Sequence, residues 1–226
     1  GFKYVGNSIN VIVNLPAVIE PTIGPALSSS GVVNVWDIEE GASWEYTVDT
    51  GSEWLIGSGT SFVLDEGNYA DGAVQFRQTD IAGNQSAPVL MGPINVDKTP
   101  PVLTGAELRA DGVTLVMSFD EQIGKQPEPV DLSFEVDGQA YDGSFAKIEL
   151  GVAENANQIL ITLSQAIDQE SVISNLNYNA ATGEPGSIED AAGNLASSGG
   201  VTNVSNNSNL FAFDGPVSSW TRRKLR

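Results

Sequence analysis

The sequence contains neither cysteine nor histidine. Without these residues the chain can form no disulfide, no thiolate nucleophile, no zinc site of the usual kind and no histidine-dependent catalytic triad. The lack of cysteine fits both a reducing cytosol and a secreted protein, so it does not by itself indicate a compartment. Because these kinds of catalytic chemistry are excluded, we expect that the protein is not an enzyme.

Basic residues are also scarce. The 226 residues include 10 basic and 29 acidic side chains, which gives a formal net charge of −19. Four of the basic residues are crowded at the end of the chain, at Arg222, Arg223, Lys224 and Arg226. Such a chain repels phosphate backbones and anionic lipid and attracts divalent cations, so we expect no nucleic-acid partner. The alternative is an acidic surface that serves only solubility.

Long apolar runs are missing as well. No run approaches the length of about 18 residues that a membrane-spanning helix needs, so we expect no membrane insertion. Gly1 is neither an initiator methionine nor the start of a signal-peptide pattern. These features suggest a piece of a longer protein.

What the chain does contain is a series of short strand-like runs separated by Gly, Asp, Asn or Pro. In residues 113–119, apolar side chains alternate with others, as in a strand with one face in a core. Only residues 165–174 suggest a short helix or a turn. Many short strands at this spacing predict an all-β protein made of β-sandwiches. The remaining predicted strands are residues 9–13, 32–36, 44–48, 61–64, 73–78, 89–96, 134–136, 144–150 and 158–163.

One pattern, D-x-A-G-N, occurs twice, at residues 80–84 and 190–194. The repeat predicts two tandem β-sandwich domains. Each copy also combines an Asp carboxylate, a Gly that permits a tight turn and an Asn carbonyl, which are suitable oxygen ligands for calcium. The alternative is structural, because Asp can hydrogen-bond its own turn while Gly takes a left-handed conformation. Magnesium is a weaker candidate because it requires a strict octahedron.

The boundary between the two domains is predicted at the consecutive residues Pro100 and Pro101, which cannot lie in the middle of a sheet. A similar strand followed by Pro16 suggests that a preceding module ends there. The predicted organisation is as follows: residues 1–16, the end of a preceding module or a linker; 17–97, the first domain; 98–214, the second domain; 215–226, a basic tail or a cloning remnant.

Several sequence segments resemble known repeats. Residues 33–36, 41–54, 57–62, 67–69 and 74–80 are similar to the bacterial Ig-like repeats of large RTX and biofilm-type surface adhesins. Residues 112–121, 134–138, 159–163 and 190–194 resemble the SwmB-type repeat of long bacterial surface proteins. The resemblance covers about residues 17–200.

This resemblance implies two Ig-like β-sandwiches in a secreted, calcium-binding array on a bacterial cell surface. Such an array projects an adhesive tip and contacts the neighbouring modules of its own chain. We therefore expect a monomeric, calcium-stiffened extender segment. The chain departs from these adhesins in having no glycine-rich nonapeptide repeat and no evident tip module.

In an Ig-like topology, alternate loops lie at the same end of a sandwich, which brings separate acidic segments together. We predict an inter-domain calcium site where the loops after residues 113–119 and around residues 190–194 meet the linker and a loop of the first domain. Its predicted ligands are Asp97, Asp65, Glu66, Asp71, Asp120, Glu121, Asp190 and Asn194. Calcium takes six to eight oxygen ligands, and without it these carboxylates would repel one another.

The same reasoning predicts a weaker calcium site at the upper end of the first domain. Its proposed ligands are Asp37, Glu39, Glu40, Asp80 and Asn84, with Asn14 contributing from the entry segment. Because Asn14 stands where the other site has the charged residue Asp97, fewer carboxylates would bind the ion. Fewer carboxylates predict a lower affinity.

The aromatic residues suggest an alternative function, that of a glycan- or protein-binding module of the same adhesin. Trp54 and Tyr69, together with the strand residues Trp36, Trp44 and Tyr46, could form a sugar-stacking surface. For the three strand residues we favour packing in the core. The adjacent pairs Glu39-Glu40 and Asp120-Glu121 do not supply the two separated carboxylates of a glycosidase.

Overall fold

The computed structural model describes residues 3–5, 8–12, 26–128, 131–179 and 187–211. Strands dominate this part of the chain, which contains no α-helix, and Ala153–Asn155 form a 3-10 turn. The protein is therefore all-β, with several sheets, as predicted. None of the described segments forms a helix of the length and apolarity that crossing a membrane requires.

The chain forms two compact units. Unit 1 comprises Gly1–Pro100 together with Glu189–Leu195, and unit 2 comprises Pro101–Ile188 and Ala196–Arg226. Each unit contains its own hydrophobic cluster. We describe the units separately.

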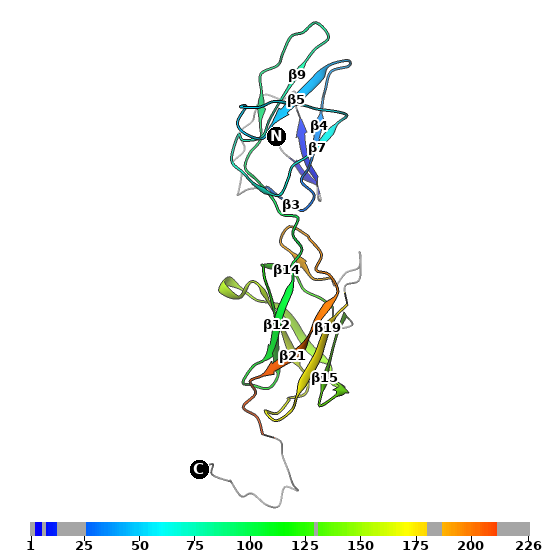
Figure 1. Ribbon diagram of the computed structural model, residues 1–226, viewed down its shortest axis with the longest axis vertical. Coiled ribbons are helices and arrows are strands. Elements are labelled where there is room, and N and C mark those ends of the chain that lie inside the picture. Colours follow the sequence, from blue (N-terminus) through cyan, green and yellow to red (C-terminus); the bar gives the residue numbers. More distant parts are fainter. Residues whose placement is uncertain (1–2, 6–7, 13–25, 129–130, 180–186, 212–226) are drawn as a thin grey trace, which may run out of the picture. The chain divides into compact units, whose positions relative to one another are not determined.

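Unit 1 contains three small sheets, with strand orders β1-β2-β4-β7, β10-β9-β5-β6 and β3-β11-β8. Figure 1 labels the neighbours β4 and β7 of the first sheet and β5 and β9 of the second. Strand β2 runs parallel to β4, and β3 runs parallel to β11, whereas β5 and β9 are antiparallel. The bounds are β1 Lys3–Val5, β2 Ser8–Ile12, β3 Ala26–Ser28, β4 Val32–Trp36, β5 Ser43–Thr47, β6 Leu55–Ile56, β7 Ser61–Val63, β8 Gly67–Tyr69, β9 Gln75–Thr79, β10 Val89–Leu90 and β11 Ile94–Val96. The two-residue β20, Glu189–Asp190, also belongs to this unit.

Aromatic side chains fill much of the core of unit 1. Tyr46 stacks on Phe62 with ring centroids 4.1 Å apart, and Phe62 meets Phe76 at 5.4 Å in a tilted arrangement. Trp44 is buried beside them, and its indole N–H donates to the Gly59 carbonyl at 3.0 Å. This bond satisfies the polar group of a buried ring, so Trp44 fits the core without loss of a hydrogen bond.

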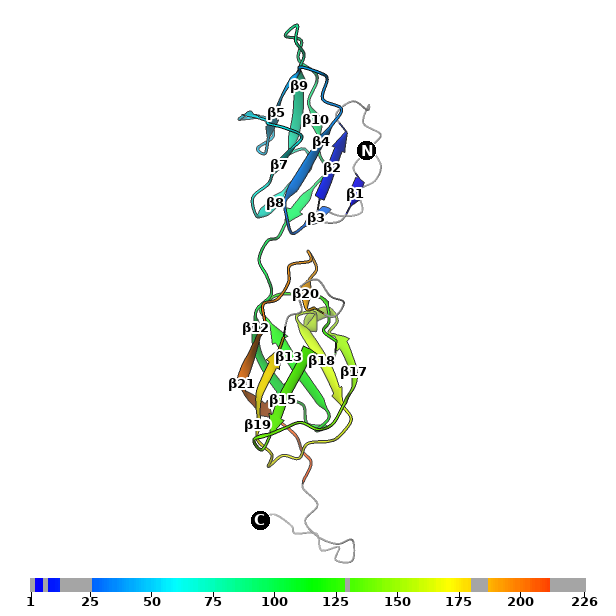
Figure 2. The ribbon, with the colours of Figure 1, turned by 90° about the vertical axis from the view of Figure 1, so that its right-hand side faces the viewer.

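Unit 2 is built on one eight-stranded sheet with the order β16-β15-β19-β21-β12-β13-β18-β17 (Figure 2). Among its described strands, β12 and β21 run parallel, and the other neighbouring strands are antiparallel. The bounds are β12 Leu103–Leu108, β13 Thr114–Phe119, β14 Ile123–Lys125, β15 Leu132–Val136, β16 Gln139–Ala140, β17 Phe145–Leu150, β18 Gln158–Leu163, β19 Ile173–Tyr178 and β21 Gly199–Asn206.

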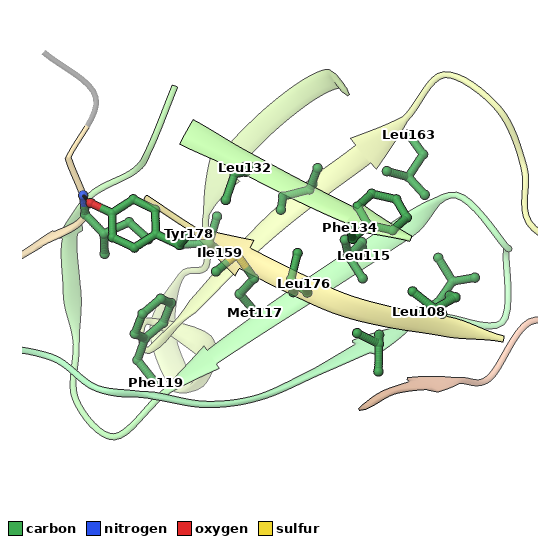
Figure 3. Close-up of a cluster of buried hydrophobic side chains, with 14 of the residues drawn as sticks. Leu108, Leu115, Met117, Phe119, Leu132, Phe134, Ile159, Leu163, Leu176 and Tyr178 are labelled. Atoms are coloured by element: carbon green, nitrogen blue, oxygen red, sulfur yellow. Dashed lines mark hydrogen bonds between the residues drawn. The ribbon is translucent and has the colours of Figure 1, made fainter. Parts of the chain in front are cut away.

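The core of unit 2 lies between these strands, as Figure 3 shows. Leu115 and Met117 of β13 pack with Ile159 of β18, and Leu176 of β19 joins the same cluster. Tyr178 is buried near one end of the cluster, where its hydroxyl accepts a hydrogen bond from the Ile188 N–H at 2.7 Å. In β18 half-buried and buried side chains alternate, as the sequence pattern predicts, whereas in β13 Val116 is buried as well as Leu115 and Met117.

Some predicted elements differ from the structure. The predicted strand 89–96 is two strands, β10 and β11, because Gly92 and Pro93 interrupt the pairing. Residues 165–174 were predicted as a short helix or a turn; the structure has a turn and bends there, followed by the start of β19 at Ile173, and the Asp168 carboxylate accepts the Glu170 and Ser171 N–H groups. The loop of the first domain that was predicted to carry the ligands Asp65, Glu66 and Asp71 contains β8, which pairs with β11. The predicted tail, residues 215–226, lies outside the described residues.

Candidate metal centre

The two D-x-A-G-N segments form the same local structure. In the first, the backbone N–H and the side-chain amide of Asn84 donate to the two carboxylate oxygens of Asp80, each at 2.7 Å. In the second, Asn194 makes the same two bonds to Asp190, at 2.8 and 2.7 Å. In both, the Asp N–H donates to the carbonyl of the Asn. The repeated motif therefore encodes a loop in which Asn orients the Asp carboxylate.

Glycine has a definite role in this loop. Gly83 and Gly193 have φ angles of 88° and 89°. A residue with a side chain is strained in this left-handed region, whereas glycine enters it without penalty. The turn chemistry expected of the motif is therefore present in both copies, including the hydrogen bonds by which Asp binds its own turn.

The described residues contain one group of at least three acidic side chains that could hold a metal ion: Asp97, Glu121 and Asp190. One ligand oxygen from each lies within 4.8 Å of the others. Asp190 is buried with 4 % of its surface exposed, while Asp97 and Glu121 are half-buried. All three were predicted as inter-domain ligands, and they come from three separate segments of the chain.

The chemistry of this group is that of a possible metal site, because carboxylate oxygens are ligands for hard cations. Two oxygens bound to one calcium ion at about 2.3–2.6 Å each can lie up to about 5 Å apart, which accommodates the observed spacing. Asp97 and Asp190, which have ligand oxygens within 4.8 Å of each other, repel when both are ionised. A divalent cation would remove this repulsion.

The segment that carries Asp97 is held by several bonds within unit 1. The Asp97 N–H donates to the Ser28 carbonyl at 3.0 Å, and the Asp97 carboxylate accepts the Thr99 N–H at 3.2 Å. Lys98 donates through Nζ to the Leu64 carbonyl at 2.7 Å. No sequence pattern predicted the bond from Lys98, although a lysine beside Asp97 stands out in a chain with so few basic residues.

The other predicted ligands of this site have different surroundings. The Glu66 carboxylate accepts the Thr99 hydroxyl at 3.0 Å, and the Asp120 carboxylate accepts the Val102 N–H at 2.8 Å. Asp65 and Asp71 are exposed, and the Asp65 carbonyl accepts the Tyr69 hydroxyl. The structure groups none of these four with Asp97, Glu121 and Asp190. Asn194 contacts the group through hydrogen bonds to Asp190 and Asp97.

The predicted site at the upper end of the first domain is not assembled as a group of three acidic side chains in the described residues. Asp37, Glu39 and Glu40 are exposed, and Asp80 with Asn84 forms the loop described above. The N–H of Glu39 donates to the Gln78 side chain at 3.0 Å. Asn14 lies outside the described residues.

The aromatic residues considered for sugar binding are distributed between the core and the surface. Trp44 and Tyr46 pack in the core of unit 1 as expected, but Trp36 is 52 % exposed. The expectation for Trp36 was wrong because β4 places Trp36 on the face opposite Val33 and Val35. The Arg77 guanidinium lies 3.8 Å from the ring centroid of Trp54, so Trp54 already makes a cation–π contact on one face.

The bonds from Asn84 affect the acidity of Asp80. The side-chain amide of Asn84, followed by its backbone N–H, stabilises the ionised carboxylate and lowers the pKa of Asp80 below its ordinary value. A lowered folded-state pKa contributes stability above the unfolded pKa of about 3.9. That contribution is lost as the pH falls through the folded-state pKa.

We therefore expect Asn84→Ala to raise the pKa of Asp80 towards its ordinary value, because the side-chain donor is lost. A carbon-13 NMR titration of the aspartate carboxyl groups would measure the change. Asp49 is an internal control, since a hydrogen bond from the Thr47 side chain is the main cause of its own lowered pKa. An unchanged titration of Asp80 would contradict the assigned role of Asn84.

Comparison with known proteins found no matching family model and no matching curated sequence.

Proposed function

We propose that this chain is a non-enzymatic, calcium-stiffened segment of a large bacterial surface adhesin, and that it acts as a secreted spacer. The observation that carries the proposal is the group formed by Asp97, Glu121 and Asp190, whose ligand oxygens lie within 4.8 Å of one another. Carboxylates at this spacing match calcium, which binds through several oxygen ligands. The strongly acidic composition further favours a role that depends on a divalent cation.

The position of Asp97 in the chain supports a mechanical role. Asp97 precedes Pro100 and Pro101 by only a few residues, and proline restricts the backbone of a linker. Bound calcium would remove charge repulsion beside this stretch and would hold Asp97 in one arrangement. A chain that is stiff in calcium and more mobile without it suits a spacer that must transmit force. The glycan-binding alternative has less support, because Arg77 lies on the ring of Trp54.

Calcium should raise the thermal stability of the protein. A ligand that binds only the folded state adds about 2.7 kcal/mol to the free energy of unfolding at a hundredfold excess over its Kd. We expect calorimetric titration to detect binding and thermal unfolding to show a higher Tm in calcium than in chelator. Small-angle scattering should show a narrower distribution of chain dimensions in calcium.

Two variants make this test specific. Asp190→Asn removes one carboxylate from the group and should weaken calcium binding, whereas Asp37→Asn changes an exposed acid outside the group and should bind calcium as the unaltered protein does. A parallel titration with magnesium should give weaker binding. The proposal fails if chelator changes neither the Tm nor the scattering dimensions.

A further inference from the structure

The two D-x-A-G-N loops differ in one hydrogen bond. Asn84 and Asn194 each donate from the backbone N–H and from Nδ2 to the Asp that begins the motif. Asn194 makes an additional bond, in which Nδ2 donates to the main-chain carbonyl of Asp97 at 2.7 Å. No corresponding third bond from Asn84 is found within the described residues. Both partners of the additional bond, Asp97 and Asn194, belong to unit 1.

The additional bond uses the full donor capacity of the Asn194 side chain. An asparagine amide nitrogen carries two hydrogens, and those of Asn194 are directed to Asp190 Oδ2 and to the Asp97 carbonyl. The nitrogen end of an amide cannot bind a cation. Asn194 therefore presents to Asp190 and Asp97 the end of its side chain that donates hydrogen bonds.

We infer that Asn194 is a positioning residue, which orients the Asp190 carboxylate and ties the main chain at Asp97 to the same loop without any cation. Its amide donors replace the ligand oxygen that the sequence pattern predicts at this position. Both Asp190 oxygens receive one hydrogen bond from Asn194, which holds the carboxylate in a single orientation. A carboxylate fixed in this way loses less conformational freedom when it binds an ion.

The bond can be tested in the absence of any metal. In excess chelator, proton–nitrogen NMR spectra should show slow exchange for both side-chain amide hydrogens of Asn194. Asn84 is the matched control, because it makes the same bonds to Asp80 but lacks the third bond, so one of its amide hydrogens should exchange faster. Equal, fast exchange at Asn194 in chelator would overturn the inference.

A second test separates positioning from ligation, and it alone rests on the proposed calcium function. Asn194→Asp keeps the size of the side chain, removes the two amide donors and adds a carboxylate oxygen. If Asn194 positions Asp190, this variant should bind calcium about 10–100-fold more weakly, as is usual when a partner of a metal ligand is lost. If Asn194 is itself a ligand, the added carboxylate should leave the affinity unchanged or raise it, and that result would overturn the inference.

Asn84→Asp makes the same chemical change in the other copy of the motif. Because Asn84 donates to Asp80 and not to Asp190 or Asp97, this control should leave calcium binding at Asp97, Glu121 and Asp190 within about twofold of its original strength, well short of a 10–100-fold loss. If the unaltered protein binds no calcium, the proposed function fails. The exchange measurement in chelator still decides the role of Asn194. If Asn194→Asp does not fold, the exchange measurement still tests the role of Asn194, because that measurement uses the unaltered protein.

Discussion

Replacing Trp44 with alanine should lower the free energy of unfolding of unit 1 by about 3–5 kcal/mol. The side chain is 4 % exposed and lies 6.0 Å from Tyr46 and 6.1 Å from Phe62, measured between ring centroids. The replacement leaves a cavity and also removes the donor to the Gly59 carbonyl. Urea unfolding followed by circular dichroism would measure the loss, with the slope of the transition compared between variants.

Trp36→Ala is the matched control for this change. It removes the same side chain from the same unit, but Trp36 is 52 % exposed and is not among the residues of the core cluster. Surface substitutions usually change stability by no more than about 0.5 kcal/mol, and we expect a small effect of this order. Equal losses for the two tryptophans would mean that the core of unit 1 is wrongly assigned.

Replacing Phe134 with alanine should destabilise unit 2 by about 3–5 kcal/mol. Phe134 is 3 % exposed, and its ring stacks on Tyr141 at 4.6 Å and on Phe145 at 6.2 Å. Removing it would end both aromatic contacts in a core that includes Leu115 and Leu163 (Figure 3). Calorimetric unfolding in a fixed calcium concentration would measure the effect.

Phe211→Ala is the control for unit 2, because Phe211 is 62 % exposed. We expect the free energy of unfolding of this variant to be close to that of the unaltered protein. A loss of stability as large as that of Phe134→Ala would contradict the assignment of the core.

Together, Trp44→Ala and Phe134→Ala also test whether the two units unfold independently. If the units unfold independently, each core variant should shift one transition and leave the other in place.

The strands were the most predictable part of the fold. The predicted runs 32–36 and 158–163 coincide with β4 and β18, and the run 113–119 differs from β13 only at its first residue. In β18 the buried and half-buried side chains alternate along the strand. This agreement arises because a strand with one face in a core must alternate, which leaves a direct trace in the sequence. The predicted run 89–96 failed because it crossed Gly92 and Pro93, and proline has no N–H to donate to a neighbouring strand.

The candidate site was predictable only in part. Asp97, Glu121 and Asp190 were all named from loop positions, and the structure groups them. The adjacent residue Asp120 was named on the same grounds, but its carboxylate accepts the Val102 N–H instead. Adjacent residues in a loop point in different directions, so which of two neighbouring acids faces a cation depends on the local backbone. The donor role of the Asn194 amide is a further example, because asparagine can present either an oxygen or a nitrogen.

The sequence by itself determined the all-β class, the repeated D-x-A-G-N loop with its left-handed glycine, and the exclusion of cysteine and histidine chemistry. These properties follow from composition, alternation and local turn geometry, which act over a few residues. Only the tertiary structure decided that Asp190 is buried near Asp97 while the equivalent Asp80 is not in such a group. The two loops are alike locally, and the difference lies in the distant segments that each one meets.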